Sequence, residues 1–152
     1  MDADFSHNPD ELNHKIDFFI KKKLDMLIAS RYTKNSKIRN WGIFRRIFSF
    51  LSNFLAKLLL QIPCTDYTNG FRFYSRRAAE KVVLNCGKIG GGFIVLSEIL
   101  VVIYLNNFKI KELPTVFVNR KRGESSVSVK LIISSFFGLI KLYFLKKKKH
   151  GL

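Results

Sequence analysis

Acidic residues are scarce in this sequence. Only 11 aspartates and glutamates stand against 27 lysines and arginines, which gives a formal net charge of +16 over 152 residues. Such an excess of positive charge favours polyanionic partners, namely nucleic acid, anionic lipid headgroups or phosphorylated substrates. Cysteine is scarce too, since only Cys64 and Cys86 occur. Two cysteines provide no disulfide framework and suit a reducing compartment, so we expect each to be a buried thiol.

Long uninterrupted apolar runs are also missing, although 47% of the residues are hydrophobic and 15 are phenylalanine. That content excludes wholesale disorder and suffices for the core of one domain. The longest helical pattern, residues 43–60, is apolar around much of its circumference but contains Arg45, Arg46 and Lys57. Such a helix is either buried on two sides or lies on a membrane surface. The charges argue against a membrane span, and we favour a core helix buried on two sides.

The last apolar segment, residues 129–145, is interrupted by Lys141 and followed by the lysine run 146–149. This pattern predicts an amphipathic helix lying on an anionic membrane surface, where each nearby lysine contributes about 1 kcal/mol. We therefore divide the chain into residues 1–127, an α/β domain, and residues 128–152, a basic membrane-associating helix and tail.

The remaining elements alternate in type, which indicates an α/β fold. Asn8 and Pro9 open a helix that extends to about Lys22, with Glu11 in the position of a capping-box acid and apolar residues on one face. Its predicted apolar face consists of Leu12, Ile16, Phe19 and Ile20. Strands are expected at 24–30, 71–74 and 109–118, and helices at 76–85 and 93–105. We expect residues 31–46 to begin as a polar, mobile loop, and His7 and His14 to be surface residues.

Asp2 and Asp4, separated by Ala3, are the first candidate site. Two carboxylates at this spacing can bind one hard divalent cation, Mg²⁺ or Mn²⁺, which prefers oxygen ligands and leaves positions open for phosphates. Alone, the pair is better interpreted as two solvated aspartates, and only the motifs downstream favour the metal site. Further along, Glu98 lies within an apolar helix and needs a partner or a function, and the partner we expect is a basic residue. The run Gly90–Gly92 is interpreted as a hinge.

Six short motifs resemble, in order, the family 2 glycosyltransferases of the dolichol-phosphate mannosyltransferase and polyprenyl-phosphate glycosyltransferase group. They are Met1–Pro9 (MDADFSHNP), Ala29–Tyr32 (ASRY), Asn40–Trp41 with Arg45, Arg46 and Ser49, Asp66–Tyr74 (DYTNGFRFY), Glu98, and Glu112–Pro114 with Arg120–Ser125 (RKRGES). The resemblance implies a GT-A, Rossmann-like α/β domain. The nucleotide-binding strands of that domain would precede the acidic motif, so we expect this chain to be its C-terminal part.

The resemblance also implies roles for individual residues. Asp2 and Asp4 would hold the metal on the donor diphosphate, with Ser6 assisting, and Ala3 between them would also contact the donor. Arg31, Arg45 and Ser49 would bind phosphate, chiefly that of a lipid acceptor, and Arg31 and Arg120 would also contact the donor. Asp66 is a candidate catalytic residue, more by orienting an arginine or the acceptor than as a base. Some members carry lysine where this chain has Ser126, so the chain departs from the family pattern at one donor-side contact.

The function that the resemblance implies is metal-dependent, inverting transfer of a hexose to a dolichyl or polyprenyl phosphate at the cytoplasmic face of a membrane. The expected donor is a nucleotide sugar; the resemblance favours GDP-mannose, although UDP-glucose or another UDP-sugar would use the same metal motif. A lipid phosphate is already ionised near neutral pH, so a strong general base is not needed. One alternative is a truncated, non-catalytic chain that binds membrane or a partner. A nucleic-acid-binding module is less favoured, because the sequence has no recognised nucleic-acid motif and its aromatic residues lie on apolar faces.

Overall fold

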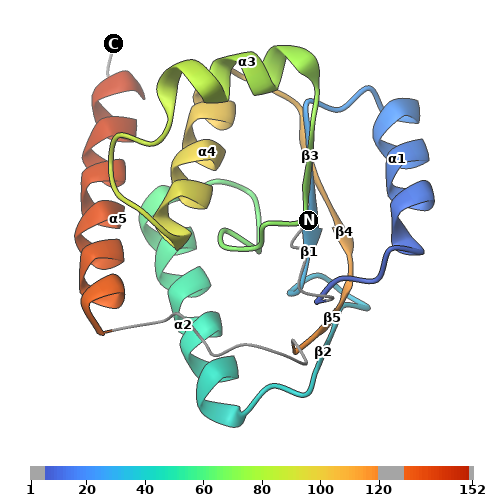
Figure 1. Cartoon of the computed structure of the whole chain (residues 1–152). Helices are drawn as coiled ribbons and strands as arrows, with labels where there is room; N and C mark the ends of the chain where they lie inside the picture. Colours follow the sequence, from blue (N-terminus) through green and yellow to red (C-terminus); the bar gives the residue numbers. More distant parts are fainter. Residues whose placement is uncertain (1–5, 120–128, 151–152) are drawn as a thin grey trace.

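The computed structural model describes residues 6–119 and 129–150 and is a mixed α/β structure (Figure 1). Its elements in chain order are α1 (Glu11–Lys21), β1 (Met26–Ser30), β2 (Lys37–Arg39), α2 (Ile43–Leu60), β3 (Arg72–Tyr74), α3 (Arg76–Asn85), α4 (Phe93–Leu105), β4 (Ile110–Pro114), β5 (Val116–Val118) and α5 (Val129–His150). The predicted helices at 43–60, 76–85 and 93–105 are confirmed with the expected bounds. The small sheets and their covering helices are consistent with part of a GT-A domain.

The central sheet has three strands in the order β3–β1–β4. β1 pairs with β3 in antiparallel and with β4 in parallel orientation, so that Ile28 lies between Arg72 and Glu112. Every residue of β1 is buried, because α1 covers one face of the sheet and the other helices lie on the opposite side (Figure 1). Burial on both faces explains why this strand reads as a continuous apolar run.

A second, parallel sheet joins β2 to β5, although they are far apart in sequence. The prediction of one strand over 109–118 is therefore wrong in part. Thr115 separates β4 from β5, and its backbone amide donates to Ser30 O at 3.1 Å. The predicted loop after Arg31 likewise contains β2. Three residues with alternating exposure give too short a signal in sequence, and only the distant partner strand reveals them.

Helix α1 begins at Glu11 with Asp10 as its N-cap, slightly later than predicted. The carboxylate of Glu11 does not close a capping box. It accepts hydrogen bonds from Lys15 Nζ at 2.7 Å, Thr115 Oγ1 at 2.7 Å and the amide of Val116 at 3.0 Å. Burial raises the pKa of Glu11, but these bonds together lower it below its ordinary value.

The face that α1 turns to the sheet also differs from the prediction. Lys15 is buried there and donates to Pro114 O at 2.8 Å, whereas Ile20 is 66% exposed. The ion pair with Glu11 and the carbonyl of Pro114 supply the polar partners that a buried ammonium requires. The pattern of apolar residues alone therefore predicted the wrong buried face for α1.

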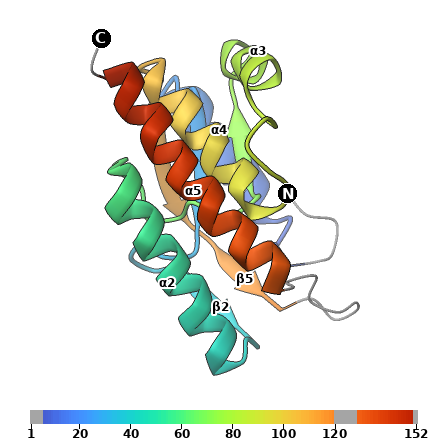
Figure 2. The same cartoon turned by 90° about the vertical axis from the view of Figure 1, so that its left-hand side faces the viewer.

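Helices α2, α4 and α5 form a layer in which α5 packs against both of the others (Figure 2). Leu139 and Leu142 of α5 belong to the same hydrophobic cluster as Met26 of β1 and Leu100 of α4. The close approach of α4 and α5 depends on glycine: a Cβ at Gly138 would lie 2.7 Å from Ile94 Cγ1. The domain boundary expected at residues 127–128 lies outside the described residues, but α5 shares the core of the preceding helices.

The expectation that α2 is a core helix buried on two sides is wrong. Only Asn53, Ala56 and Leu60 of this helix are buried, and most of its large apolar side chains face solvent. These exposed residues are Ile43, Phe44, Ile47, Phe48, Phe50, Leu51, Phe54 and Leu58. The helix has the apolar outer face expected of a helix that lies on a membrane, the alternative considered from sequence.

The two cysteines are free thiols. Cys64 is buried as expected, and burial raises its pKa to about 12. Cys86 is only half-buried, and burial raises its pKa to about 11. Both sulfurs are therefore protonated near neutral pH and are poor nucleophiles.

Candidate functional site

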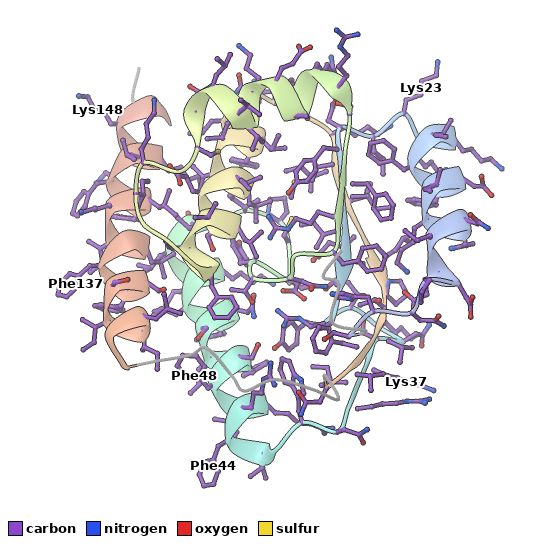
Figure 3. All side chains as sticks on the ribbon, viewed as in Figure 1. Lys23, Lys37, Phe44, Phe48, Phe137 and Lys148 are labelled. Atoms are coloured by element: carbon purple, nitrogen blue, oxygen red, sulfur yellow. The ribbon has the colours of Figure 1, made fainter. Side chains whose placement is uncertain are left out.

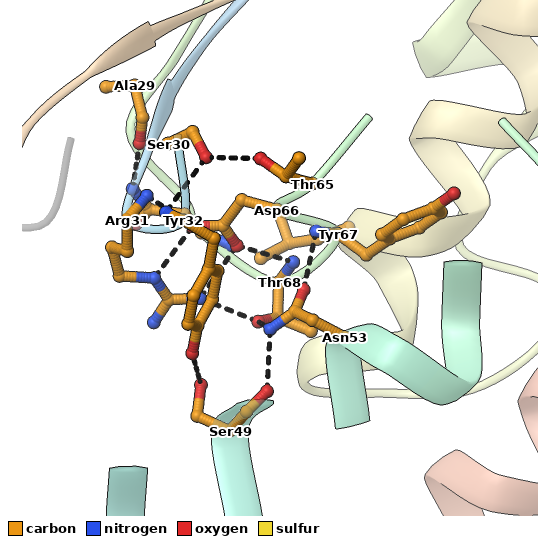
Figure 4. Close-up of polar contacts among 12 residues, drawn as sticks. Ala29, Ser30, Arg31, Tyr32, Ser49, Asn53, Thr65, Asp66, Tyr67 and Thr68 are labelled. Atoms are coloured by element: carbon orange, nitrogen blue, oxygen red, sulfur yellow. Dashed lines mark hydrogen bonds and ion pairs between the residues drawn. The ribbon is translucent and has the colours of Figure 1, made fainter. Parts of the chain in front are cut away.

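A buried ion pair between Arg31 and Asp66 lies beyond the carboxyl end of β1 (Figure 4). The guanidinium donates through Nε to Asp66 Oδ2 and through Nη2 to Asp66 Oδ1, both at 2.8 Å. The backbone amide of Arg31 donates to Asp66 Oδ2 at 2.9 Å. This bidentate arrangement fixes the plane and direction of the guanidinium. The arginine that Asp66 orients is thus Arg31.

Asp66 also organises the turn that carries it. Its Oδ1 accepts from the amides of Thr68 at 3.2 Å and Asn69 at 3.0 Å. Burial raises the pKa of this carboxyl, but the charge and hydrogen bonds of Arg31 outweigh burial and hold the pKa below its ordinary value. A buried carboxylate that stays ionised and has donors on both oxygens is suited to positioning rather than to proton abstraction.

Glu112 of β4 holds the same turn through hydrogen bonds to its carboxylate. Its carboxylate accepts from the amides of Thr65 at 2.8 Å and Asp66 at 2.9 Å, and from Thr65 Oγ1 at 3.0 Å. Thr65 Oγ1 in turn lies 2.9 Å from Ser30 Oγ at the end of β1. The sequence placed Glu112 in a motif without a role, because only the parallel pairing of β1 with β4 brings it to the Asp66 turn.

The inner side of α2 is polar where the helix passes the ion pair. Arg45, Ser49 and Asn53 occupy positions four residues apart, so they form one stripe along the helix. Ser49 Oγ accepts from the Tyr32 hydroxyl at 2.7 Å, and Asn53 bonds to the turn that contains Asp66 (Figure 4). The structure therefore brings Arg31, Ser49 and Asp66 into one connected network.

Trp41 brings Arg45 to this network. The guanidinium carbon of Arg45 lies 4.5 Å from the centre of the indole ring, and that of Arg31 lies 5.6 Å from the same centre. Arg45 Nη1 also donates to Asn119 Oδ1 at 2.7 Å. Two guanidinium groups near one aromatic ring give this region a strong positive potential, and an anionic ligand would reduce the repulsion between them. The buried Trp41 Nε1 has no hydrogen-bond partner in the part of the chain that the structure describes.

Several predicted site residues lie outside the described residues: Asp2, Ala3, Asp4 and Arg120, together with Ser126. Within 6–119 and 129–150, no cluster of three or more histidine, cysteine or acidic side chains could hold a metal ion. Ser6 is described and buried, and its carbonyl accepts from the amide of Val118 at 2.9 Å. The segment that follows the acidic motif is therefore attached to β5.

His7 is not the surface residue expected from sequence, whereas His14 is exposed. The imidazole of His7 is buried between Phe71, at 4.8 Å between ring centres, and Phe117, at 5.0 Å. His7 also pairs with Phe117 as an isolated β-bridge. Its neighbours come from β3 and β5 and their flanks, so its local sequence gave no signal of burial.

Glu98 also has partners different from those expected. Its carboxylate is buried and accepts from the backbone amides of Gly87 at 2.9 Å and Lys88 at 3.3 Å, rather than from a basic side chain. It therefore fixes the loop between α3 and α4. In the same loop Gly92 has a φ of +70°, and a Cβ there would lie 2.8 Å from Leu131 Cδ1. Glycine is required at this position by backbone conformation and by packing; hinge motion of the run stays a prediction.

A broad apolar face covers the outside of α2 and α5. Helix α5, which packs beside α2, also has exposed apolar side chains, namely Ile132, Ile133, Phe136, Phe137, Phe144 and Leu145. Figure 3 shows Phe44 and Phe137 pointing away from the body of the protein. Exposed Lys57 and Lys141 lie on the same helices. None of the described helices is long and apolar enough to cross a bilayer.

The chain belongs to glycosyl transferase family 2, whose family model matches residues 1–83. Two curated relatives narrow the group. The chain is 32% identical over 137 residues to a polyprenol monophosphomannose synthase from Mycolicibacterium smegmatis, covering 90% of this chain and 51% of the relative. It is 34% identical over 134 residues to a dolichol-phosphate mannosyltransferase from Pyrococcus furiosus, covering 87% of this chain and 36% of that protein. The chain thus spans about half or less of each relative.

Proposed function

We propose that this chain forms the acceptor-binding part of a glycosyltransferase that moves mannose from GDP-mannose to a dolichyl or polyprenyl phosphate with inversion. The names of the two relatives support the choice of a polyprenyl or dolichyl phosphate as acceptor and of mannose as the transferred sugar. The observation that carries the proposal is the meeting of Arg31 and Arg45 on Trp41, beside the Ser49 hydroxyl. Guanidinium groups and a hydroxyl are suitable donors for a phosphate monoester.

In the proposed reaction, an oxygen of the lipid phosphate attacks the anomeric carbon of mannose while the bond to the nucleoside diphosphate breaks. The attacking oxygen is already ionised, so no side chain needs to remove a proton. Arg45 and Ser49 hold the acceptor phosphate, and Arg31 lies between acceptor and donor. Asp66 acts by keeping Arg31 in its plane, because the carboxylate uses both oxygens for that contact.

The donor side depends on residues outside the two described ranges. Asp2 and Asp4 would hold Mg²⁺ or Mn²⁺, with Ala3 beside the donor, and Arg120 would contact the diphosphate. When held there, the metal would stabilise the negative charge that develops on the leaving diphosphate. Family membership supports this assignment.

We further propose that the protein binds the cytoplasmic face of a membrane through the apolar face of α2 and α5. That orientation places the lipid-phosphate residues on the inner side of the helix whose outer side contacts the bilayer. Burial of exposed phenylalanines would contribute apolar transfer energy, and the excess of basic residues would favour anionic headgroups. The acceptor could then be bound without leaving the membrane.

Transfer of labelled mannose from GDP-mannose to polyprenyl phosphate in the presence of Mg²⁺ tests the function, measured in a protein that joins this chain to the nucleotide-binding strands of a family 2 glycosyltransferase. Arg45→Ala should raise the KM for polyprenyl phosphate more than that for GDP-mannose, and Asp4→Ala should abolish transfer. A larger effect of Arg45→Ala on the donor KM would contradict the acceptor role. Binding to polyprenyl-phosphate vesicles without any transfer would support the alternative of a non-catalytic, membrane-binding chain.

Vesicle co-sedimentation tests the membrane face. Phe44, at 86% exposure, can be replaced at little cost in stability, and Phe44→Asp should weaken partitioning about tenfold or more by removing one buried aromatic side chain. Val83→Asp is the matched control, since Val83 is 81% exposed on α3, away from the proposed face. Equal effects of both substitutions would contradict this orientation. Lys147→Ala should weaken binding only slightly.

A further inference from the structure

Ser49 receives a hydrogen bond from a side chain that the proposed function does not use. The hydroxyl of Tyr32 donates to Ser49 Oγ at 2.7 Å (Figure 4). Burial raises the pKa of Tyr32, so the phenol keeps its proton near neutral pH and remains a donor. Because Ser49 Oγ accepts this bond, its own proton is directed to another acceptor. That geometry suits a serine that donates to an anionic oxygen.

Tyr32 itself is held in a defined position. Its backbone amide donates to Ser30 Oγ at 3.2 Å, at the end of β1. Its ring lies next to the Arg31 guanidinium, with 5.5 Å between the ring centre and the guanidinium carbon. The ring also contacts Phe50 of α2, at 6.4 Å between ring centres. Tyr32 therefore connects the strand that carries Arg31 with the helix that carries Ser49.

Asn53 makes a second connection between the same parts. Its Oδ1 accepts from the amide of Tyr67 at 2.7 Å, and its Nδ2 donates to Ser49 O at 2.8 Å and Thr68 Oγ1 at 3.2 Å. Thr68 Oγ1 also accepts from Arg31 Nη2 at 2.7 Å. The buried amide thus joins the helix to the turn that holds the ion pair.

We propose that Tyr32 is a positioning residue that orients the Ser49 hydroxyl toward the acceptor phosphate, while Asn53 fixes α2 relative to Arg31. The inference rests on the proposed function, because it assigns the phosphate to Ser49 and Arg45. The physical advantage is that the Ser49 hydroxyl is oriented before the phosphate binds. A serine hydroxyl whose rotation is restricted loses less entropy when it binds phosphate than a freely rotating one.

This arrangement matters because α2 has two contact surfaces. Its outer residues would lie against lipid, whereas its inner stripe faces the ion pair. A shift of the helix on the membrane would move Ser49 and Arg45 away from Arg31, which stays attached to β1. The bonds of Tyr32 and Asn53 oppose that shift from two positions one helical turn apart.

A double-mutant cycle of Tyr32→Phe and Ser49→Ala in the full chain tests the proposal. The measured quantity is binding to phosphatidylcholine vesicles that contain polyprenyl phosphate, compared with vesicles that contain phosphatidylglycerol at equal charge. Ser49→Ala should weaken the preference for polyprenyl phosphate about tenfold or more, as expected for a hydrogen bond to a charged group. Tyr32→Phe, which keeps the ring, should weaken it about three- to tenfold.

The decisive result is the effect of Tyr32→Phe when Ser49 is already alanine. If Tyr32 acts through Ser49, the second substitution then has no further effect on the preference. Equal losses in both backgrounds would overturn the proposal, because the phenol would be acting elsewhere. Tyr74→Phe is the matched control, since Tyr74 pairs with Met26 at the opposite end of β1. It should leave binding unchanged.

Failure of the inference differs from failure of the proposed function. If Ser49→Ala weakens the preference and Tyr32→Phe does not, the acceptor site stands and the positioning role of Tyr32 is refuted. If neither Ser49→Ala nor Arg45→Ala changes the preference, the acceptor-phosphate site itself is refuted and the inference with it. Thermal unfolding of each variant, followed by circular dichroism, separates both results from loss of the fold.

Discussion

Replacing Asp66 by asparagine should destabilise the protein strongly, although the two side chains have nearly the same shape. The carboxylate accepts from three donors of Arg31 and from two backbone amides of its own turn. Asparagine keeps one acceptor oxygen and places an NH₂ group where the second was. The guanidinium would then be buried without a counter-charge. Breaking a buried ion pair in this way costs about 3–5 kcal/mol.

For a chain of this length, a loss of that size lowers the melting temperature by roughly 10 °C. Thermal unfolding followed by circular dichroism measures the shift, and Asp17→Asn on the exposed side of α1 is the control for loss of one negative charge. The double variant Arg31→Met with Asp66→Asn should be more stable than Asp66→Asn alone, since no unpaired charge remains. A melting temperature of Asp66→Asn within the error of the control would refute the reasoning.

Three further predictions concern the fold away from the ion pair. The guanidinium of Arg77 lowers the pKa of Asp25 from 3.8 to about 2. The contribution of this ion pair to the stability of the fold is therefore present above pH 3.8 and is lost as the pH falls toward 2. Asp25→Asn should therefore lower the unfolding free energy by about 1–2 kcal/mol at pH 7, and chemical denaturation should show this difference shrinking through that range. Gly138→Ala should cost about 1–3 kcal/mol by the same measurement, because the added methyl group meets Ile94 and overpacking outweighs the better helix propensity of alanine. In the native protein at neutral pH, a thiol reagent should modify Cys86 slowly and Cys64 more slowly still, with both reacting rapidly after denaturation; rapid native labelling of Cys64 would contradict its burial.

The helices were predictable because each contains its own signal. Helix α3 has Ser75 at its N-cap, accepting from the amide of Ala78, and α4 is an apolar run bounded by glycine and asparagine. β1 was predictable for a similar reason, since a short apolar run covered on both faces needs no alternation. Local propensity and a local boundary were sufficient for these elements.

Short strands and buried polar residues were not predictable in this way. β2 exists because β5 lies beside it, and Lys15 is buried because Glu11 and Pro114 O receive its ammonium. His7 is buried because the rings of Phe71 and Phe117, distant in sequence, enclose its imidazole. In each case the stabilising partner is distant in sequence or was not recognised as a partner, so hydropathy alone gave the wrong answer.

The sequence alone determined the family of this protein and the set of candidate residues. Motifs such as Asp66–Tyr74, and the order in which they occur, can be recognised without knowing which residues they contact. Only the tertiary structure decided what these residues contact. It joined Asp66 to Arg31, placed Ser49 under the Tyr32 hydroxyl, and turned the phenylalanines of α2 outward. Those outcomes depend on the orientation of α2 relative to β1. That orientation is set by packing and hydrogen bonds between distant segments, which no local pattern encodes.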